Sequence, residues 1–436
     1  MDNVTIGAVA TLIGLGLVAL RVQIGVALGI VSFFGIAAIL NMRAAWGIVT
    51  AVPFNFVGDW NLTAVPMFLL MGYVAFSADL TSGLFRAMRI LLSRLPGGLA
   101  VASVGACAML AAASGSSVAT SSAMARIATP EMLRFKYDPG LASGVIASSG
   151  TLGSLIPPSI LMVLYGYFAE VSIAQLFMAG FLPGLLSAAL FATMIITRAT
   201  LNPALAPMVK ERFTRAEKLS ALREVWPMPV LIVGVLSGIF VGWFTPTEAG
   251  AVGAALAMVL AGVRRRLNRA VLVDAVTRTV VGTAGIFMVV IGTVLLARLM
   301  ALSGLPNALA EFMLSWGGDQ LTVILMVVVL YLILGMFLDS IGILLLTLPI
   351  ILPVTETVEI DLIWFGIILI KLLEIGLVTP PVGLNVYVMK GALGNLVPLT
   401  TIFRGVGWFI ATDVVTLVII VAFPMLSLWL PSMMAQ

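Results

Sequence analysis

The sequence contains no histidine and only one cysteine, Cys107. Without histidine the chain has no Ser-His-Asp triad, no imidazole general base and no histidine metal ligand. A single cysteine excludes an internal disulfide. Charged residues make up only 10% of the 436 residues, whereas 61% are hydrophobic. A soluble protein of this length needs far more charge to cover its surface, so the composition predicts a membrane protein.

Apolar runs of roughly 17–25 residues recur along the chain, and each is long enough to cross ~30 Å of hydrocarbon as a helix. The N-terminus begins Met-Asp-Asn and lacks a basic segment, so its first apolar run is predicted to be a retained span. The net charge of +4 lies in loops and indicates topology, not nucleic-acid binding. We predict unbroken spans over residues 5–20, 24–41, 62–80, 174–197, 228–244, 247–263, 280–297 and 402–430.

The two halves of the chain share short motifs in the same order. Pro66–Gly72 aligns with Gly285–Ile291, and Gly153-Ser-Leu-Ile-Pro-Pro158 aligns with Gly376-Leu-Val-Thr-Pro-Pro381. The offset between the copies changes by only a few residues along their length. The pattern therefore predicts an internal duplication, with residues 1–225 as the first repeat plus a cytoplasmic connector and 226–436 as the second.

Loop charges predict that the two repeats are inverted. The loops around the Pro130 segment carry Arg86, Arg89, Arg94, Arg134 and Lys136. The equivalent loops of the second repeat carry Glu311, Asp319, Glu356, Glu359 and Asp361. Lys and Arg mark the cytoplasmic side, so equivalent loops lie on opposite sides of the membrane. Arg298, which falls on the outer side, is an exception to this pattern.

Each repeat contains one segment that is too short to cross the membrane twice. Two full spans need ~40 residues, but residues 98–131 begin and end at basic loops and residues 318–355 begin and end at acidic loops. Both are predicted to be re-entrant hairpins, with turns at Ser114–Ser117 and near Leu338–Ser340. Consecutive prolines inside apolar runs also predict broken helices over 140–168 and 361–389.

Four interruptions of helix inside a membrane require an explanation. Backbone groups without hydrogen bonds are tolerated there only where protein buries them or where they face a water-filled cavity. Exposed carbonyls and hydroxyls are hard oxygen ligands that suit small cations. Helix N-termini favour anions. Such sites near the midplane are typical of inverted-repeat transporters. The alternative for the small-residue cluster around Ser114–Ser122 is close helix packing.

Individual charged residues in apolar segments leave two interpretations open. Asp339 is either an ion ligand or a hydrogen-bonded hairpin cap. Glu374 lies three residues after Lys371, so the two form either a structural ion pair or a functional one. Arg126 could meet substrate carboxylates, but the two favoured alternatives are that it extends its charge toward the membrane surface or that it forms a structural pair.

At these residues the sequence resembles the large membrane subunit of tripartite ATP-independent periplasmic (TRAP) transporters, in the ion-transporter superfamily. The resemblance covers both halves. Its motifs are Pro66–Gly72, Ser114–Ser117, Gly150–Ser159, Gly335–Ser340 with Pro349, and Glu374-Ile-Gly-Leu-Val-Thr-Pro-Pro-Val-Gly-Leu-Asn385.

The resemblance implies an all-α polytopic membrane protein with an elevator mechanism, driven by sodium, in the bacterial inner membrane. It implies a small carboxylate substrate, such as a C4-dicarboxylate, sialic acid or another sugar acid. Its implied partners are a four-helix small membrane subunit, expected to be a separate chain, and a periplasmic substrate-binding protein. The implied substrate-binding residues are Ser116, Ser117, Ser154, Ser340 and Asn385. The implied sodium ligands are Ser114, Ser116, Gly153, Ile156 and Pro158 at one site, and Asp339, Gly376, Val378 and Thr379 at the other.

Three other functions remain open at this stage. A stand-alone sodium- or proton-coupled anion carrier of the same superfamily would lack the two partner proteins. A membrane-embedded enzyme has little support, because Asp339 has no second aspartate in a comparable apolar context. A channel would also accommodate two re-entrant loops, and only saturable, coupled flux distinguishes it from a carrier.

Overall fold

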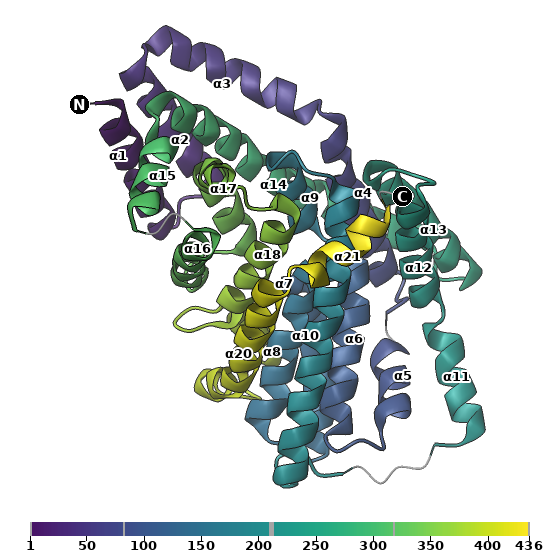
Figure 1. Ribbon diagram of the computed structural model, residues 1–436. Coiled ribbons are helices and arrows are strands. Elements are labelled where there is room, and N and C mark those ends of the chain that lie inside the picture. Colours follow the sequence, from purple (N-terminus) through teal and green to yellow (C-terminus); the bar gives the residue numbers. More distant parts are fainter. Residues whose placement is uncertain (1, 82, 209–212, 317–318, 435–436) are drawn as a thin grey trace.

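The computed structural model describes residues 2–81, 83–208, 213–316 and 319–434, and within these ranges every regular element is a helix and none is a β-strand (Figure 1). Six of the described helices are long and apolar enough to cross a membrane, and two bent helix pairs raise that number to eight. The predicted all-α polytopic fold is confirmed. Part of the predicted connector, 209–212, and the first residue of the predicted second hairpin, Gly318, lie outside the described residues.

The first half places a re-entrant hairpin and a broken helix in sequence, as the duplication predicts. Its elements are α1 (Asn3–Ala19), α2 (Ile24–Ile39), α3 (Met42–Val57), the 3-10 helix η1 (Trp60–Thr63), α4 (Ala64–Ser77), α5 (Gly83–Leu92), the hairpin arms α6 (Gly98–Ser114) and α7 (Ser117–Arg134), the broken helix α8 (Pro139–Leu155) with α9 (Ile160–Phe168), and α10 (Ile173–Leu201).

The second half repeats this order after the connecting helix α11 (Arg215–Val225). Its elements are α12 (Pro227–Val241), α13 (Pro246–Val263), α14 (Arg269–Ser303), α15 (Leu305–Trp316), the hairpin arms α16 (Gln320–Gly335) and α17 (Ser340–Thr357), the broken helix α18 (Leu362–Val378) with α19 (Leu384–Leu393), then α20 (Leu399–Ala422) and α21 (Met425–Met434).

Two predicted spans differ from the structure. The run predicted as one span over 402–430 is two helices, because Pro424 cannot donate to the helix ladder and disfavours helix at the residue before it. The run predicted over 280–297 is the centre of α14, a helix of 35 residues. Asn268 caps α14 at its start, where it accepts a hydrogen bond from the Val271 amide, and Gly304 ends it in the left-handed region.

The helices form two groups that meet along α4 and α14. We call α1, α2, α4, α12, α13 and α14 the frame, because α14 packs along α2 and α4, and α13 packs along α4. We call the hairpins, the broken helices, α10 and α20 the inner unit, because α6, α7 and α20 all pack on α8, and α16 packs on α18. The inner unit holds all four interruptions of helix.

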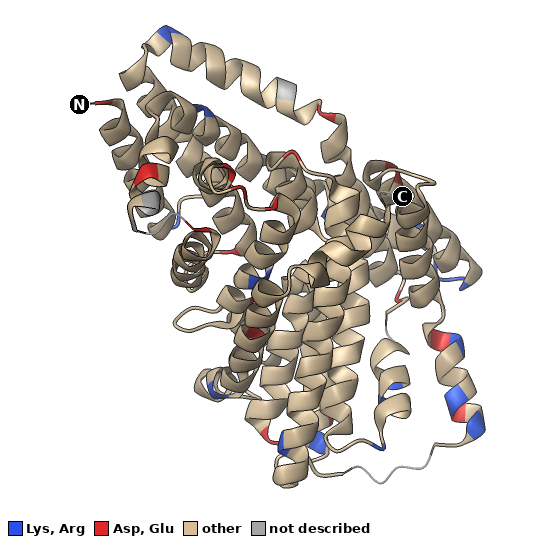
Figure 2. Cartoon of the chain, in the orientation of Figure 1, with Lys and Arg blue, Asp and Glu red and all other residues tan. Residues whose placement is uncertain are grey.

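Charge is distributed unevenly over the molecule. Several Lys and Arg residues gather toward the lower end of the view, around α5, α10 and α11, and several acidic residues lie in the upper half, near α9 and α17 (Figure 2). Gln320, at the base of the second hairpin, donates from its amide to the carbonyls of Val358 and Glu359. This closes the base of that hairpin at its acidic end.

Candidate functional site

Both hairpin turns and the first helix break converge on one small cavity of about 110 Å³. Each repeat contributes to it, so residues far apart in the sequence become neighbours. Its lining residues are Gly115, Ser116, Ser117, Val118, Ser154, Ile160, Leu161, Asp339, Ser340, Ile341, Leu377 and Leu384. We call this space the tip cavity.

Hydroxyl groups fix the turn of the first hairpin. The Ser116 side chain caps α7 and accepts from the Ala119 amide at 3.4 Å. The Ser114 hydroxyl lies 2.9 Å from the Thr120 hydroxyl, across the turn. The Ser117 hydroxyl lies 2.6 Å from that of Ser154 and joins the turn to α8. The turn is therefore held to the broken helix by side chains of the first repeat.

Close backbone contact joins the same turn to the first helix break. Gly115 has a φ of 57°, and a Cβ placed on it would lie 2.9 Å from the Pro158 carbonyl oxygen. A Cβ on Gly153 would lie 3.0 Å from the carbonyl carbon of Ser116. Of the predicted first sodium site, Ser114, Ser116, Gly153 and Pro158 thus lie where turn and break meet. Ile156 is the C-cap residue of α8, at the helix end whose last carbonyls lack intrahelical partners.

The second repeat makes an equivalent contact. A Cβ on Gly335, at the end of α16, would lie 2.7 Å from the Gly376 Cα on α18. The Val382 amide, in the second break, donates to the Met336 carbonyl in the second turn. Asp339 caps α17 and accepts from the Gly342 amide at 3.1 Å. The structure therefore shows Asp339 to be a hairpin cap that also lines the tip cavity.

The predicted second sodium site is spread along this contact. Asp339 lines the tip cavity, whereas Gly376, Val378 and Thr379 form the end of α18 and are absent from that lining. Gly376 and Val378 are buried, and the Thr379 hydroxyl donates to the Ile375 carbonyl at 2.6 Å. These three residues thus border the second break beside the turn that carries Asp339.

Four of the five predicted substrate residues lie together, and one does not. Ser116, Ser117, Ser154 and Ser340 all line the tip cavity. The Ser340 hydroxyl is buried and has no hydrogen-bond partner within the part of the chain that the structure describes. Asn385 is elsewhere: it is fully buried, and its side-chain amide donates to the Ala147 carbonyl of α8. Its side chain is therefore bonded to α8, and Asn385 is not among the residues that line the tip cavity, although its neighbour Leu384 is.

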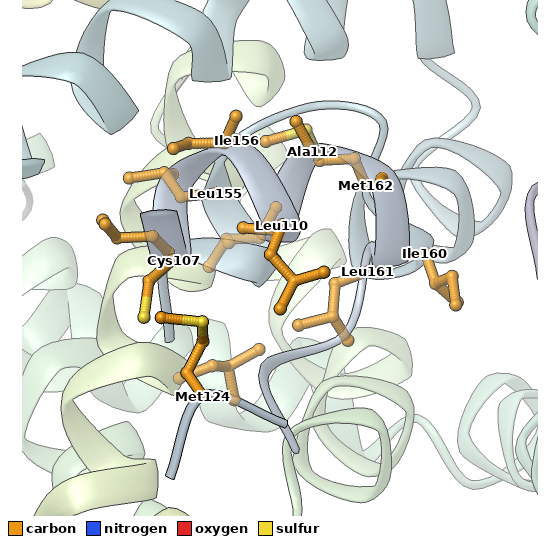
Figure 3. Packing of buried hydrophobic residues seen from close by; sticks show 14 of the residues in the cluster. Cys107, Leu110, Ala112, Met124, Leu155, Ile156, Ile160, Leu161 and Met162 are labelled. Atoms are coloured by element: carbon orange, nitrogen blue, oxygen red, sulfur yellow. The ribbon is translucent and has the colours of Figure 1, made fainter. Parts of the chain in front are cut away.

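Apolar side chains pack around the first helix break. Figure 3 shows Leu110 of α6, Met124 of α7, and Ile156, Ile160, Leu161 and Met162 around the first break packed side by side. All of them are buried. Ile160 and Leu161 extend this apolar packing to the wall of the tip cavity, whereas Ser114, Gly115 and Ser116 of the turn are partly exposed.

A buried charge cluster lies deeper in the inner unit. The Lys371 ammonium donates to Asp413 at 2.5 Å, to Glu374 at 3.0 Å and to the Ser187 hydroxyl at 3.1 Å. Lys371, Glu374 and Asp413 have fully buried side chains and come from α18 and α20, while Ser187 comes from α10. The Lys371–Glu374 pair was predicted. Asp413 was missed, although a carboxylate within an apolar span was a signal that pointed to it.

The structure also explains Arg298, the exception to the charge rule. Arg298 lines a second, larger cavity of about 840 Å³ together with Asp59, Glu170 and Glu248. Acidic side chains in the wall of the same cavity create a field that favours a cation there. Sequence neighbours could not reveal this, because the three acidic residues belong to separate loops and helix ends.

Comparisons with known proteins agree with this architecture. The sequence model of the family "Tripartite ATP-independent periplasmic transporter, DctM component" matches residues 11–426. The chain is 32% identical to the C4-dicarboxylate TRAP transporter large permease protein DctM of Vibrio cholerae, over 96% of each chain. It is also 32% identical to the sialic acid TRAP transporter large permease protein SiaM of the same organism, over 86% of this chain and 87% of the relative. The crystal structure of the YdaH transporter of Alcanivorax borkumensis shares the fold, with a TM-score of 0.63, 16% identity and coverage of 88% of this chain and 90% of that one.

Proposed function

Because the chain belongs to the family of tripartite ATP-independent periplasmic transporters, as a DctM component of the inner membrane, we propose that it imports a small carboxylate by sodium-coupled secondary transport. The observation that carries this proposal is the convergence of two hairpin turns and a helix break on one cavity. The relatives named above are permeases, so we assign this chain to transport across the membrane and not to catalysis.

Sodium fits the oxygen groups at the two turn-and-break contacts. The hydroxyls of Ser114 and Ser116 and the carbonyls at the end of α8 are neutral, hard ligands. The Asp339 carboxylate adds the charge of the second site. A cation bound at either contact would join a turn to a break and hold the tip cavity in shape.

A carboxylate fits the space between the turns. Helices α7 and α17 both begin at the tip cavity, so two positive dipole ends face it from opposite repeats. The hydroxyl of Ser340 has no hydrogen-bond partner among the described residues and is available to donate to an anion. The relatives named for C4-dicarboxylate and for sialic acid indicate the substrate class, in which a carboxylate is the shared group.

Transport requires the cavity to open to each side in turn. We assign the moving part to the inner unit and the static part to the frame, as in an elevator. Sodium drives the change only if it binds the substrate-competent state more tightly than the other state. The hairpin turns meet this requirement if the bound sodium ion contacts the same residues that form the anion site. Sodium then stabilises the conformation that binds the substrate.

Two partners follow from this proposal: a small four-helix membrane subunit and a periplasmic substrate-binding protein that delivers the carboxylate. Affinity purification of the tagged chain from its own membranes tests both. Recovery of a small membrane protein and of a soluble periplasmic protein supports a tripartite system. Purification of the chain alone, with carboxylate uptake intact, supports the stand-alone carrier.

The decisive experiment is uptake by the reconstituted complex. Proteoliposomes that contain the chain and its membrane partner, supplied with the loaded binding protein, are compared with and without an inward sodium gradient. We expect saturable carboxylate uptake only with the gradient. Uptake that is indifferent to sodium removes the coupling, and uptake that does not saturate favours a channel.

Asp339 offers a mutation that separates charge from structure. Asp339→Asn removes the negative charge but keeps a side-chain acceptor for the Gly342 amide, since Asn caps helices as well as Asp does. We expect normal thermal stability and a rise of about tenfold in the sodium concentration for half-maximal uptake, equivalent to ~1.4 kcal/mol.

Asp339→Ala serves as the companion variant. It removes the capping bond as well, so a further loss of about 1 kcal/mol in stability is expected. The measurements are sodium titrations of uptake and thermal unfolding in detergent. An unchanged sodium dependence in Asp339→Asn would leave Asp339 with the capping role alone.

A further inference from the structure

A third cavity adjoins the tip cavity on the side that carries the basic loops. It has a volume of about 660 Å³ and lies between the first hairpin and the frame helices α4 and α14. Ser116, Ile160 and Ile341 line both cavities, so the two spaces lie next to each other. We call the larger space the vestibule.

The ionic lining of the vestibule has one sign. Arg126 and Arg278 line it, together with polar groups of Tyr73, Thr81 and Ser122, and no carboxylate is among its described lining residues. The rest of the wall is mostly apolar. Cations in a water-filled space with low-dielectric walls focus an attractive field on anions.

Arg126 has no visible structural role. It lies on α7, nine residues after Ser117, which places it ~14 Å from the turn along the helix axis. Its side chain is exposed, and within the described ranges of the chain it makes no hydrogen bond or ion pair. An arginine inside a membrane segment that faces a cavity without a partner carries guanidinium donors available to a ligand.

Arg278 is held in place but only partly engaged. Its Nε donates to Asp274 at 2.9 Å, one turn earlier on α14, and the Ser77 hydroxyl of α4 donates to the same aspartate at 2.7 Å. One of five guanidinium donors is therefore used, and the side chain remains about half exposed. The aspartate fixes the arginine and weakens its hold on any second anion.

We propose that Arg126 and Arg278 form a carboxylate-binding station in the vestibule, through which the substrate passes between the tip cavity and the cytoplasmic side. This inference rests on the proposed function. Without these cations a carboxylate leaving the tip cavity would cross an apolar wall with no counter-charge. One arginine belongs to the inner unit and the other to the frame, so the station is built across the interface between the two groups.

A station of this kind affects the rate of passage more than the affinity of the tip cavity. In the proteoliposome assay, Arg126→Gln and Arg278→Gln are each expected to lower the maximal uptake rate by about fivefold to tenfold, with less than a twofold change in half-saturating substrate. Arg126→Lys is expected to retain most of the rate. Arg134→Gln is the matched control, because it removes an exposed arginine from the end of the same helix.

Charge rescue distinguishes a binding role from a structural one. The variant R126C is treated with a cationic or an anionic methanethiosulfonate reagent, while the wild-type chain, whose Cys107 is fully buried, reports background labelling. We expect the cationic reagent to restore uptake and the anionic reagent to abolish it. The inference is overturned if both reagents act alike, or if the two glutamine variants transport at the wild-type rate. Absence of carboxylate uptake by the wild-type complex is a separate result, which rejects the proposed function itself.

Discussion

The variant Lys371→Met is expected to lose most of its folded protein from the membrane. Lys371 is the only cation in contact with Glu374 and Asp413 within the described chain, and all three side chains are fully buried. Removing one partner of a buried ion pair typically costs about 3–5 kcal/mol, because the remaining charge is left uncompensated. Here two carboxylates would remain, in a region that Phe191 and other apolar residues surround. Fluorescence-detected gel filtration of tagged protein in mild detergent measures the loss.

The cluster contains one cation and two carboxylates, so we expect substitution of Lys371 to destabilise the protein far more than substitution of either carboxylate. Glu374→Gln leaves Lys371 paired with Asp413, and Asp413→Asn leaves it paired with Glu374, so each variant retains one balanced pair. Both are expected to fold, with thermal midpoints well above that of Lys371→Met. Lys218→Met, at an exposed position of α11, is the matched control for losing a lysine. Equal damage in all three cluster variants would mean that hydrogen-bond geometry, not charge balance, holds the cluster.

The cluster also shows where sequence reasoning reaches its limit. Lys371 and Glu374 were paired because residues three apart share one face of a helix. Asp413 lies on α20, and only the packing of α18 against α20 brings it to the ammonium. Arg298 and its three acidic neighbours were missed for the same reason. Contacts within a helix follow from spacing, whereas contacts between helices need the tertiary structure.

The interruptions of helix, in contrast, were predictable. The loop charges showed that each hairpin segment begins and ends on the same side of the membrane, and the consecutive prolines located the helix breaks. Both signals depend only on residues close together in the sequence. The structure ends α6 at Ser114 and begins α17 at Ser340, at the predicted turns. Asn385 was placed in the site because it follows the second break in the motif. The orientation of α19, which sequence does not specify, turns it toward α8 instead.

The contact between Gly335 and Gly376 supports a second prediction of large effect. A Cβ on Gly376 would lie 2.6 Å from the Gly335 Cα and 3.1 Å from its carbonyl carbon. Both are backbone atoms, so no rotamer change can relieve the overlap, and the arm α16 must move away from α18. Overpacking of this kind typically costs about 1–3 kcal/mol. Gly376→Ala is therefore expected to destabilise the chain modestly.

The effect of Gly376→Ala on transport should exceed its effect on stability, because the displaced arm leads directly to the turn that carries Asp339. We expect sodium-driven uptake to fall at least tenfold, with sodium dependence shifted to higher concentrations. Gly285→Ala on α14 is the matched control, since a Cβ there meets no atom within 4 Å. If Gly376→Ala transported like Gly285→Ala, close contact between the second turn and the second break would not be required for coupling, and the sodium site proposed there would lose its structural basis.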